Sequence, residues 1–383
     1  MTVSSFKLDI TDSAIEDLRR RLASTRLPAP IPGDPWQHGT SVPYLAELIR
    51  YWREKFDWRA EEDRLNVFPQ SIVKLADVDL HCLHVPGKGP SPRPLLLCHG
   101  WPGSVFEFLE IIPRLTDPAR FGGDPSRSFT VVAPSMPGYG LSFQAGQRGF
   151  GVEEIAECYV QLMEVLGYDR FVVQGGDWGA FVGTRMALQF PQNVMGLHLN
   201  LMPLRREKRA AEDSFEEKAY DDELAAWLKE EMGYYWIQGT RPQTLSFGLN
   251  DSPAGLAAWI AEKFRTWSDC DGEIENAISR DRLLANISFY WFTGTIGSSC
   301  YPYYARMHRP WPTPTGQTIQ VPMAYTEFPK EMVRPPRSLA EKTFTNIRRW
   351  TVMPKGGHFA ALEQPALLAQ DIVEFDRQIG SRP

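Results

Sequence analysis

The segment GGDWG (residues 175–179) places a carboxylate, Asp177, in the middle of a glycine-rich turn. An apolar run, FVVQ, precedes it, and a stretch with helical periodicity follows. A nucleophile flanked by glycines at a strand-to-helix turn is typical of a nucleophile elbow, because the turn is strained and crowded. Serine or cysteine usually occupies the central position, so the aspartate indicates a different chemistry.

An aspartate nucleophile needs no base to activate it, since its reference pKa is about 3.9. Attack by Asp177 on an sp³ carbon would give an alkyl ester whose carbonyl group belongs to the protein. A histidine would then be free to activate the water that cleaves this ester. The residue therefore predicts alkyl transfer followed by hydrolysis, and it disfavours an esterase or peptidase of the serine type.

Two other motifs could supply the partners of Asp177. HGWPG (residues 99–103) closes an apolar run, where proteins with this elbow place one donor of an oxyanion hole. The predicted donors are the backbone N–H groups of Trp101 and Trp178. GGHF (residues 356–359) follows the last predicted strand and makes His358 the candidate base. Each motif alone is usually only a turn or a helix cap, but the three in this order are specific.

The leaving group could be a halide or an epoxide oxygen. A halide requires N–H donors, and Trp178 beside the nucleophile is compatible with that. An epoxide oxygen requires an acid such as a tyrosine hydroxyl, and tyrosines occur at GYY (233–235) and YPYY (301–304). Tyrosines in an aromatic-rich segment are more often packing residues, so the composition does not decide between the two.

Short apolar runs alternate with amphipathic stretches along most of the chain. Strand-like runs occupy 77–85, 94–100, 129–140, 171–177, 196–202, 321–328 and 349–359. Helical periods lie between them, as at 152–166 and 180–190. This alternation predicts an α/β fold with a mostly parallel sheet and helices on both faces.

The pattern divides the chain into four segments. Residues 1–70 are predicted to form helices and irregular chain without strands of their own. Residues 71–202 and 313–383 form the two parts of the α/β core. A charged, aromatic-rich helical insert at 203–312 is positioned to cover the carboxyl edge of the sheet, where open α/β sheets bind their ligands.

Composition excludes several classes of function. The 383 residues carry a net charge of −6 without a long run of one sign, so a nucleic acid is not an expected partner. No secretory signal or membrane-spanning stretch is evident, and we expect a soluble cytoplasmic protein that does not bind membranes, either a monomer or a homodimer. The five cysteines are scattered without C-x-x-C spacing, which favours reduced thiols.

No metal or cofactor is indicated. His81 and His84 form an H-x-x-H pattern, but in a strand these residues point to opposite faces and no acidic or cysteine cluster accompanies them. The glycines of 175–183 do not match the G-x-G-x-x-G fingerprint of dinucleotide-binding proteins.

The sequence resembles the epoxide hydrolases of the α/β-hydrolase fold, specifically their microsomal-type branch with its soluble bacterial and fungal members. The resemblance covers nearly the whole chain and rests on FKLDITDSAIEDLRRRLASTRLP, HGWPGS, GGDWG, LNDSPAGLAAWIAEKFRTWSD, YWFTGTIGSS, FPKE and GGHFAALEQP. It implies a helical cap inserted after the sixth strand and an N-terminal meander that wraps core and cap. The membrane anchor of the animal members has no counterpart here, which agrees with a soluble protein.

The resemblance also implies roles for individual residues. Asp177 corresponds to the nucleophile, Glu331 of FPKE to the acid that orients the histidine, and His358 to the base. Tyr234 and Tyr303 correspond to the proton donors. From the pattern alone Glu327 is nearer the end of its strand than Glu331, and Tyr235 and Tyr304 are alternatives one residue away.

We expect an apolar, aryl or extended alkyl epoxide that is converted to a vicinal diol in detoxification or secondary metabolism, because aromatic residues crowd the predicted cap. These include Trp227, Trp236, Trp259, Trp267 and Trp291. The predicted pocket residues are Phe181, Trp236 and Trp291. Two alternatives remain at this point: a haloalkane dehalogenase or other α/β hydrolase, and a noncatalytic binding protein on the same fold.

Overall fold

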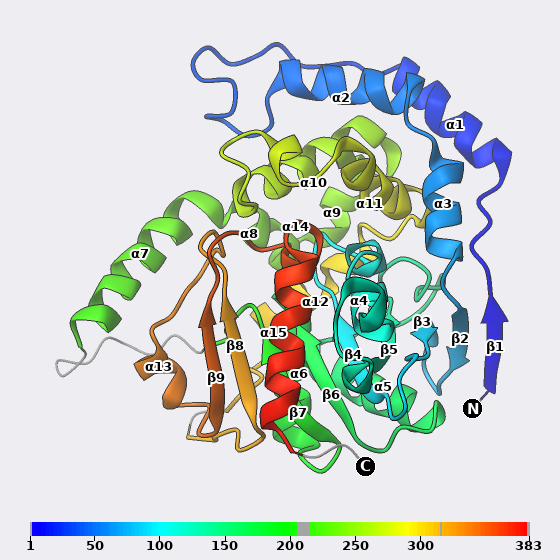
Figure 1. Ribbon diagram of the computed structural model, residues 1–383. Coiled ribbons are helices and arrows are strands. Elements are labelled where there is room, and N and C mark those ends of the chain that lie inside the picture. The colour runs from blue at the N-terminus through cyan, green and yellow to red at the C-terminus, as the bar shows by residue number, and fades with distance from the viewer. Residues whose placement is uncertain (1, 205–213, 315, 381–383) are drawn as a thin grey trace.

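The computed structural model describes residues 2–204, 214–314 and 316–380. Within them one nine-stranded sheet has the order β1-β2-β3-β5-β4-β6-β7-β8-β9 (Figure 1). The strands from β5 to β9 are parallel, and β1, β2 and β3 pair in antiparallel fashion beside β5. The strands are β1 (Thr2–Phe6), β2 (Gln70–Lys74), β3 (Asp79–Val85), β4 (Arg93–Cys98), β5 (Phe129–Pro134), β6 (Phe171–Gly175), β7 (Val194–Leu199), β8 (Met323–Glu327) and β9 (Ile347–Val352). The predicted mostly parallel sheet is therefore confirmed.

Helices cover both faces of the sheet. Neighbouring residues of a strand point to opposite faces, and in β7 Gly196 faces α15 while Leu197 faces α6. The helices of the core are α4 (Ile112–Thr116), α5 (Val152–Val165), α6 (Asp177–Gln189), α13 (Arg337–Glu341), α14 (Ala360–Glu363) and α15 (Pro365–Gln378). Every residue of β5 and β6 is buried, as expected for strands covered on both sides.

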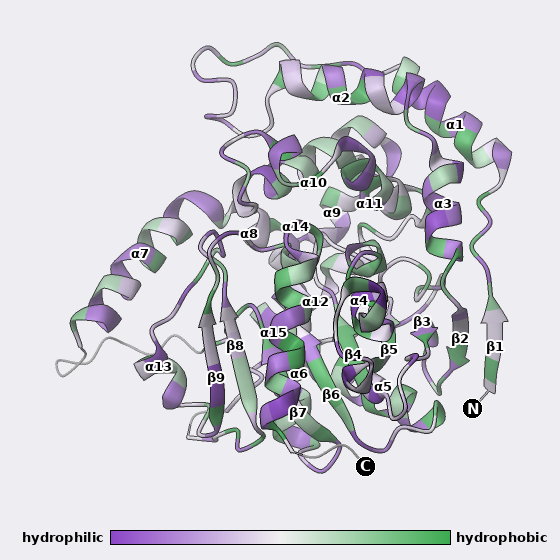
Figure 2. Ribbon diagram, in the orientation of Figure 1, coloured by the Kyte–Doolittle hydropathy of each residue, from purple (hydrophilic) through white to green (hydrophobic). Residues whose placement is uncertain are grey.

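A helical segment between β7 and β8 lies over the carboxyl ends of the strands (Figure 1). It contains α7 (Phe215–Glu231), α8 (Gly233–Thr240), α9 (Pro242–Asp251), α10 (Pro253–Trp267), α11 (Arg280–Thr293) and α12 (Tyr301–His308). This segment, the cap, follows the sixth strand when the N-terminal β1 is left out of the count. Of the insert expected at 203–312, residues 205–213 lie outside the described residues. In Figure 2 the outer helix α7 alternates between hydrophilic and hydrophobic residues, as a helix with one solvated face should.

The N-terminal region wraps around the cap with α1 (Asp12–Ala23), α2 (Val42–Glu54) and α3 (Trp58–Asn66) (Figure 1). The indole N–H of Trp52 donates to the Ser288 hydroxyl at 3.0 Å and ties α2 to α11. The expectation of no strand before residue 70 was wrong, because β1 pairs with β2 at the sheet edge. β1 is short, polar and almost fully exposed, so no buried apolar run announces it.

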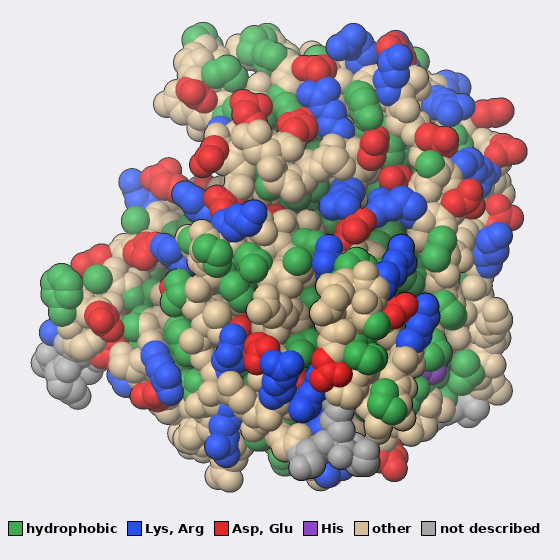
Figure 3. Space-filling view, in the orientation of Figure 1, with side chains coloured by type: hydrophobic (Ala, Val, Ile, Leu, Met, Phe, Trp, Pro, Cys, Tyr) green, Lys and Arg blue, Asp and Glu red, His purple; other side chains and the backbone are tan. Residues whose placement is uncertain are grey.

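Short 3₁₀ helices complete the secondary structure: η1 (Val105–Phe108), η2 (Pro118–Phe121), η3 (Pro125–Arg127), η4 (Ile274–Asn276) and η5 (Ser298–Cys300). All five cysteines are buried free thiols. None of the helices among the described residues has the length and apolarity to cross a membrane. Acidic and basic side chains are interspersed over the face seen in Figure 3.

Candidate active site

Asp177 occupies a strained turn between β6 and α6. Its φ is +47°, a left-handed conformation that costs energy for a residue with a side chain. Two neighbours must be glycine because of close approaches. A Cβ atom on Gly179 would lie 2.1 Å from the Cys98 carbonyl oxygen, and one on Gly100 would lie 2.2 Å from Oδ1 of Asp177. The predicted elbow is present, and the turn projects the carboxylate from the carboxyl end of β6.

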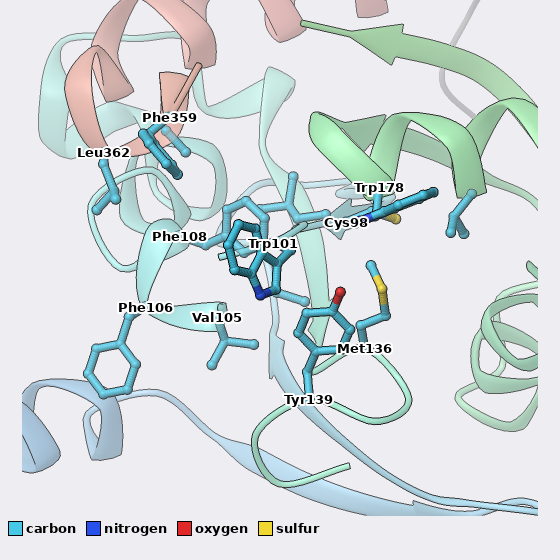
Figure 4. Close-up of a cluster of buried hydrophobic side chains, with 14 of the residues drawn as sticks. Cys98, Trp101, Val105, Phe106, Phe108, Met136, Tyr139, Trp178, Phe359 and Leu362 are labelled. Atoms are coloured by element: carbon cyan, nitrogen blue, oxygen red, sulfur yellow. The ribbon is translucent and has the colours of Figure 1, made fainter. Parts of the chain in front are cut away.

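The HGWPG motif supplies a hydrogen bond to the nucleophile. The backbone N–H of Trp101 donates to Oδ1 of Asp177 at 2.8 Å. Trp178, the other expected donor, begins the first turn of α6, where backbone N–H groups have no partner within the helix. His99 stabilises the turn by accepting a hydrogen bond from the Met136 N–H at 3.0 Å. Figure 4 shows Trp101 at the centre of a buried cluster that includes Phe108, Tyr139 and Trp178.

His358 lies between two carboxylates. Its Nε2 is 3.4 Å from Oδ2 of Asp177, and its Nδ1 is 2.8 Å from Oε1 of Glu331. The side chains of His358 and Glu331 are 2% and 0% exposed. The structure therefore brings Asp177, His358 and Glu331 together in the order expected for nucleophile, base and orienting acid. Glu327 ends β8 and has no described contact with His358.

Burial alone lowers the pKa of His358, because it penalises the imidazolium. The negative charges of Glu331 and Asp177, and their hydrogen bonds to the ring, outweigh this effect. The net result is a pKa well above the ordinary value of histidine. The two neighbouring carboxylates thus favour the imidazolium form of His358.

The loop that carries His358 is fixed by the cap. The His358 backbone N–H donates to the Trp267 carbonyl at 2.9 Å, at the C-terminus of α10. Asp269 accepts the Gly356 N–H at 2.8 Å. Glu363 accepts the N–H groups of Phe359 and Asp269 at 3.0 and 2.8 Å. These bonds make the position of His358 depend on the cap as well as on the core.

Two tyrosines of the cap lie over the nucleophile. Tyr234 of α8 stacks on the Trp101 ring at a centroid distance of 5.5 Å, and Tyr303 of α12 meets the Trp178 ring edge-on at 4.7 Å. Burial raises the pKa of both phenols well above the ordinary value, and the negative charge of Asp177 adds to the shift. The Tyr303 hydroxyl is buried beside the Tyr234 phenol and the Trp178 indole. Both phenols therefore remain protonated donors.

A cavity of about 530 Å³ opens in front of Asp177, beneath the cap. Its wall is mainly apolar and includes Trp178, Phe181, Leu224, Trp227, Tyr235, Trp236, Met307 and Trp311. We refer to it as the front cavity. Phe181 and Trp236 line it, as predicted, although Trp236 is 56% exposed.

Two other sequence-based candidates lie elsewhere. Trp291 is not among the residues that line the front cavity, so its prediction as a pocket residue was wrong; on α11 it lies 5.6 Å from the Arg21 guanidinium. Of the alternative tyrosines, Tyr235 lines the front cavity, whereas Tyr304 stacks on His308 at 4.1 Å. A one-residue step along α12 turns a side chain away by about 100°.

A second cavity of about 20 Å³ lies behind the nucleophile, large enough for one water molecule. Asp177, His358, Glu107, Gln174 and Asn200 line it together with backbone and apolar groups. We refer to it as the rear cavity. Both cavities include Asp177 in their walls.

Glu107 was not identified from the sequence. It belongs to η1 and lines the rear cavity. Burial raises its pKa to about 8, with an opposing effect of His358 and a further increase from Asp177. Ser104-x-x-Glu107 is a capping-box pattern, which indicates a structural role and conceals the residue among ordinary helix caps.

His81 and His84 serve packing and hydrogen bonding. His81 contacts Ser135 and Gln70 at 2.9 and 3.0 Å, and burial lowers its pKa to about 3. His84 contacts the Tyr168 hydroxyl at 2.9 Å. Within the described ranges no group of three or more histidine, cysteine or acidic residues is arranged to hold a metal ion.

Comparisons with known proteins agree with this geometry. A family model described as the epoxide hydrolase N terminus matches residues 3–108, and one described as the alpha/beta hydrolase fold matches residues 93–246. A putative epoxide hydrolase of Stigmatella aurantiaca is 41% identical over 99% of this chain and 86% of its own length. Epoxide hydrolase 1 of Oryctolagus cuniculus is 38% identical over 98% of this chain and 88% of its own length. The crystal structure of juvenile hormone epoxide hydrolase from the silkworm Bombyx mori superposes with a TM-score of 0.89 at 30% identity, covering 99% of this chain and 95% of that one.

Proposed function

Because the chain belongs to the epoxide hydrolases of the α/β-hydrolase fold, we propose that it converts an apolar epoxide to a vicinal diol through an ester on Asp177. One observation carries this mechanism. The carboxylate of Asp177 is shared by an apolar cavity beneath two buried phenols and a rear cavity beside a histidine–glutamate pair. The apolar cavity suits an epoxide, and the rear cavity suits the water molecule that hydrolyses the ester.

In the first step, Oδ2 of Asp177 attacks a ring carbon of the epoxide. The carbon–oxygen bond breaks, and the departing oxygen takes a proton from a phenol of Tyr234 or Tyr303. Oδ1 remains hydrogen-bonded to the Trp101 N–H and becomes the carbonyl oxygen of the ester. The second phenol donates a hydrogen bond to the same departing oxygen.

In the second step, a water molecule in the rear cavity gives a proton to His358 and attacks the ester carbonyl. The tetrahedral oxyanion forms where Trp101 and Trp178 present their N–H groups. Collapse releases the diol, whose oxygen takes the proton from His358. The carboxylic acid left on Asp177 returns a proton to the tyrosinate, so the protein regains its starting state.

Formation of the ester prepares His358 for this role. The negative charge of Asp177 contributes to the raised pKa of His358, and esterification removes that charge. The pKa of His358 then falls, so that the imidazolium releases its Nε2 proton to solvent and the neutral ring can accept one from the hydrolytic water. The released proton is taken up again when the free Asp177 carboxylate returns. Glu331 keeps Nδ1 protonated and leaves Nε2 as the accepting atom.

The front cavity supports an aryl or extended alkyl substrate. Tryptophan, phenylalanine, methionine and leucine side chains make up most of its wall, and such walls bind apolar groups by excluding water. Arg306 also contributes to the lining and lies 3.9 Å from the Trp311 ring. We propose styrene oxide as the first test substrate, because its aryl group is small enough to enter a cavity of about 530 Å³.

Two measurements test the proposal. His358→Gln incubated with styrene oxide should accumulate a covalent adduct, and peptide mass spectrometry should locate it on Asp177. In a single turnover of unmodified protein in ¹⁸O-water, the label should enter the carboxyl group of Asp177, and the first diol released should be unlabelled. A labelled first diol together with unlabelled protein would establish direct hydration instead.

Haloalkane hydrolysis is the second candidate, because one observation favours it. The indole N–H of Trp178 is buried at the wall of the front cavity, next to Asp177, where a halide-binding donor is required. Assays of 1-bromobutane beside styrene oxide distinguish the two. We expect turnover of the epoxide, and bromide release at a comparable rate would reverse the assignment.

A further inference from the structure

A buried lysine lies against the ring of Tyr234. Lys263 of α10 is 5% exposed, and its Nζ lies 4.7 Å from the Tyr234 ring centroid and 5.6 Å from that of Trp267. The same ammonium is 2.7 Å from a carboxylate oxygen of Glu262 and 3.7 Å from one of Glu231. Lys263, Glu262 and Glu231 are not among the residues that line the front or the rear cavity.

Tyr234 separates this lysine from the substrate. It lines the front cavity and also a groove of about 720 Å³ between the N-terminal meander and the cap, and Lys263, Glu231 and Glu262 line that groove as well. The phenol therefore has the substrate space on one side and a cation on the other. Trp101 stacks on the ring with an interplanar angle of 9° and limits its tilt.

A cation over the ring of a phenol stabilises the deprotonated form more than the protonated form. As the Tyr234 phenol gives up its proton, the ring becomes richer in electrons and its attraction for the ammonium grows. An interaction that strengthens only as the proton leaves lowers the barrier of that step, whereas an equal attraction in both states would not. The stacked Trp101 keeps the ring in place while the charge develops.

We propose that Lys263 is a positioning residue for epoxide opening, which holds the Tyr234 ring and strengthens its phenol as an acid from the side opposite the substrate. The inference rests on the proposed function, since it takes Tyr234 as a proton donor. The charge of Glu231, 3.7 Å from the Lys263 ammonium, acts in the opposite direction, because it disfavours a developing phenolate on Tyr234.

A purely structural role makes different predictions. In a purely structural role the Lys263–Glu231 pair would anchor α10 beside the end of α7, and the Lys263–Glu262 pair would act within α10 alone; both helices belong to the cap (Figure 1). In that case removing either sign of charge would loosen the cap and slow both chemical steps. An electrostatic role predicts that removing the positive charge of Lys263 and removing the negative charge of Glu231 change the alkylation rate in opposite directions. Hydrolysis of the adduct should then be unaffected.

The test is rapid-mixing single-turnover kinetics with styrene oxide, following alkylation by tryptophan fluorescence and hydrolysis by decay of the adduct. Lys263→Met should slow alkylation by about tenfold and leave hydrolysis unchanged. Lys263→Arg keeps a cation over the ring and should restore most of the alkylation rate. Glu231→Gln should leave alkylation equal or faster. Equal slowing of both steps by Lys263→Met, or slowing by Glu231→Gln, would overturn the proposal.

Double variants identify the tyrosine concerned. In a Tyr234→Phe background Lys263→Met should have no further effect on alkylation, whereas in a Tyr303→Phe background the full decrease should persist. A decrease that persists without the Tyr234 hydroxyl would overturn the inference. If Lys263→Met does not fold, as judged by circular dichroism, Lys263→Arg and Glu231→Gln still provide the contrast.

The same data separate this inference from the proposed function. Normal alkylation in both Tyr234→Phe and Tyr303→Phe would remove the phenols as acids and the proposed mechanism of ring opening with them. Slow alkylation in Tyr234→Phe combined with normal alkylation in Lys263→Met would remove only the role of Lys263.

Discussion

The two cavities that meet at Asp177 differ in size and in chemistry. The front cavity measures about 530 Å³ and is walled by aromatic and aliphatic side chains of the cap and of α6. The rear cavity measures about 20 Å³ and contains the polar groups of His358, Glu107, Gln174 and Asn200. One carboxylate therefore borders a large, mainly apolar space and a small polar space of about the size of one water molecule.

The difference suggests how one residue could serve two successive reactions. In front, the donors are neutral phenols that burial keeps protonated. Behind, the titrating group is a histidine whose charge is coupled to the charge of Asp177 itself. Esterification changes the rear side without altering the walls of the front side. Variants on the rear side should thus change hydrolysis, and variants on the front side should change alkylation.

The largest difference between the effects on hydrolysis and on alkylation should come from replacing Glu331, the acid that contacts His358. Glu331→Gln should slow hydrolysis of the adduct by about 10²- to 10⁴-fold, because the imidazole loses the carboxylate that orients it and stabilises its cation. Alkylation should change far less. Glu327→Gln is the matched control and should behave like the unmodified protein in the same single-turnover assay. The reverse result would make Glu327 the orienting acid.

The next largest effects should come from the two tyrosines that line the front cavity. Tyr303→Phe and Tyr234→Phe should each slow alkylation by roughly 10²-fold, since each removes one donor to the departing oxygen. Hydrolysis of a preformed adduct should keep its rate. Tyr304→Phe serves as a control, because that ring stacks on His308. An effect of Tyr304→Phe equal to that of Tyr303→Phe would contradict the register.

The pH dependence should also differ between the two steps. His358 must be neutral to accept a proton from water, so the hydrolysis rate should rise about tenfold per pH unit until it passes the pKa of His358 in the ester. That pKa should lie below the pKa of His358 in the resting protein, where Asp177 raises it. Adduct decay measured across pH 5 to 9 and an NMR titration of the histidine give the two values. Hydrolysis that slows with rising pH would rule out this role.

Glu107 offers a smaller test of the rear cavity. Glu107→Leu removes both oxygens and should slow hydrolysis by about tenfold, while Glu107→Gln, which resembles the neutral acid, should retain most of the rate. Alkylation should be unchanged in both variants. Comparable alkylation and hydrolysis defects would indicate only a lost helix cap.

Glu107→Gln should also change how the stability of the protein depends on pH. Burial raises the pKa of Glu107 from 4.5 to about 8, so between those pH values the folded protein keeps it protonated while the unfolded chain ionises it, and the stability of the folded state falls as the pH rises. Glu107→Gln removes that loss of stability. Its Tm relative to the unmodified protein should therefore increase from about pH 5 to about pH 9, and a constant difference would argue against the raised pKa.

The smallest effects should come from the wall of the front cavity. Trp227→Ala should raise KM for styrene oxide by a few-fold, because it removes apolar surface that the aryl group would contact. The rate of hydrolysis should not change. Trp291→Ala is the control for removing an indole from the cap outside this wall. Equal changes of KM in both variants would place the substrate elsewhere.

Several features of the fold and the site could be predicted from the sequence because their chemistry is local. The elbow, the HGWPG turn and the GGHF turn are contiguous stretches in which glycines permit close approach and the strand before each turn aims it at one sheet edge. The alternation of apolar runs and helical periods predicted the parallel strands for the same reason. The exposed strand β1 has no buried face and lacked any such signal.

By itself, the amino-acid sequence determined the candidate nucleophile, the order of the motifs and the prediction of a two-step reaction that an aspartate implies, because these depend on residue types and short spacings. The resemblance in FPKE favoured Glu331 over Glu327, and the tertiary structure shows that Glu331 contacts His358. Only the tertiary structure decided that Trp291 lies away from the front cavity and that Glu107 lines the rear cavity. Each of these depends on how loops and helices distant in the chain pack. A side chain's direction there is set by contacts with residues tens to hundreds of positions away, which no short pattern encodes.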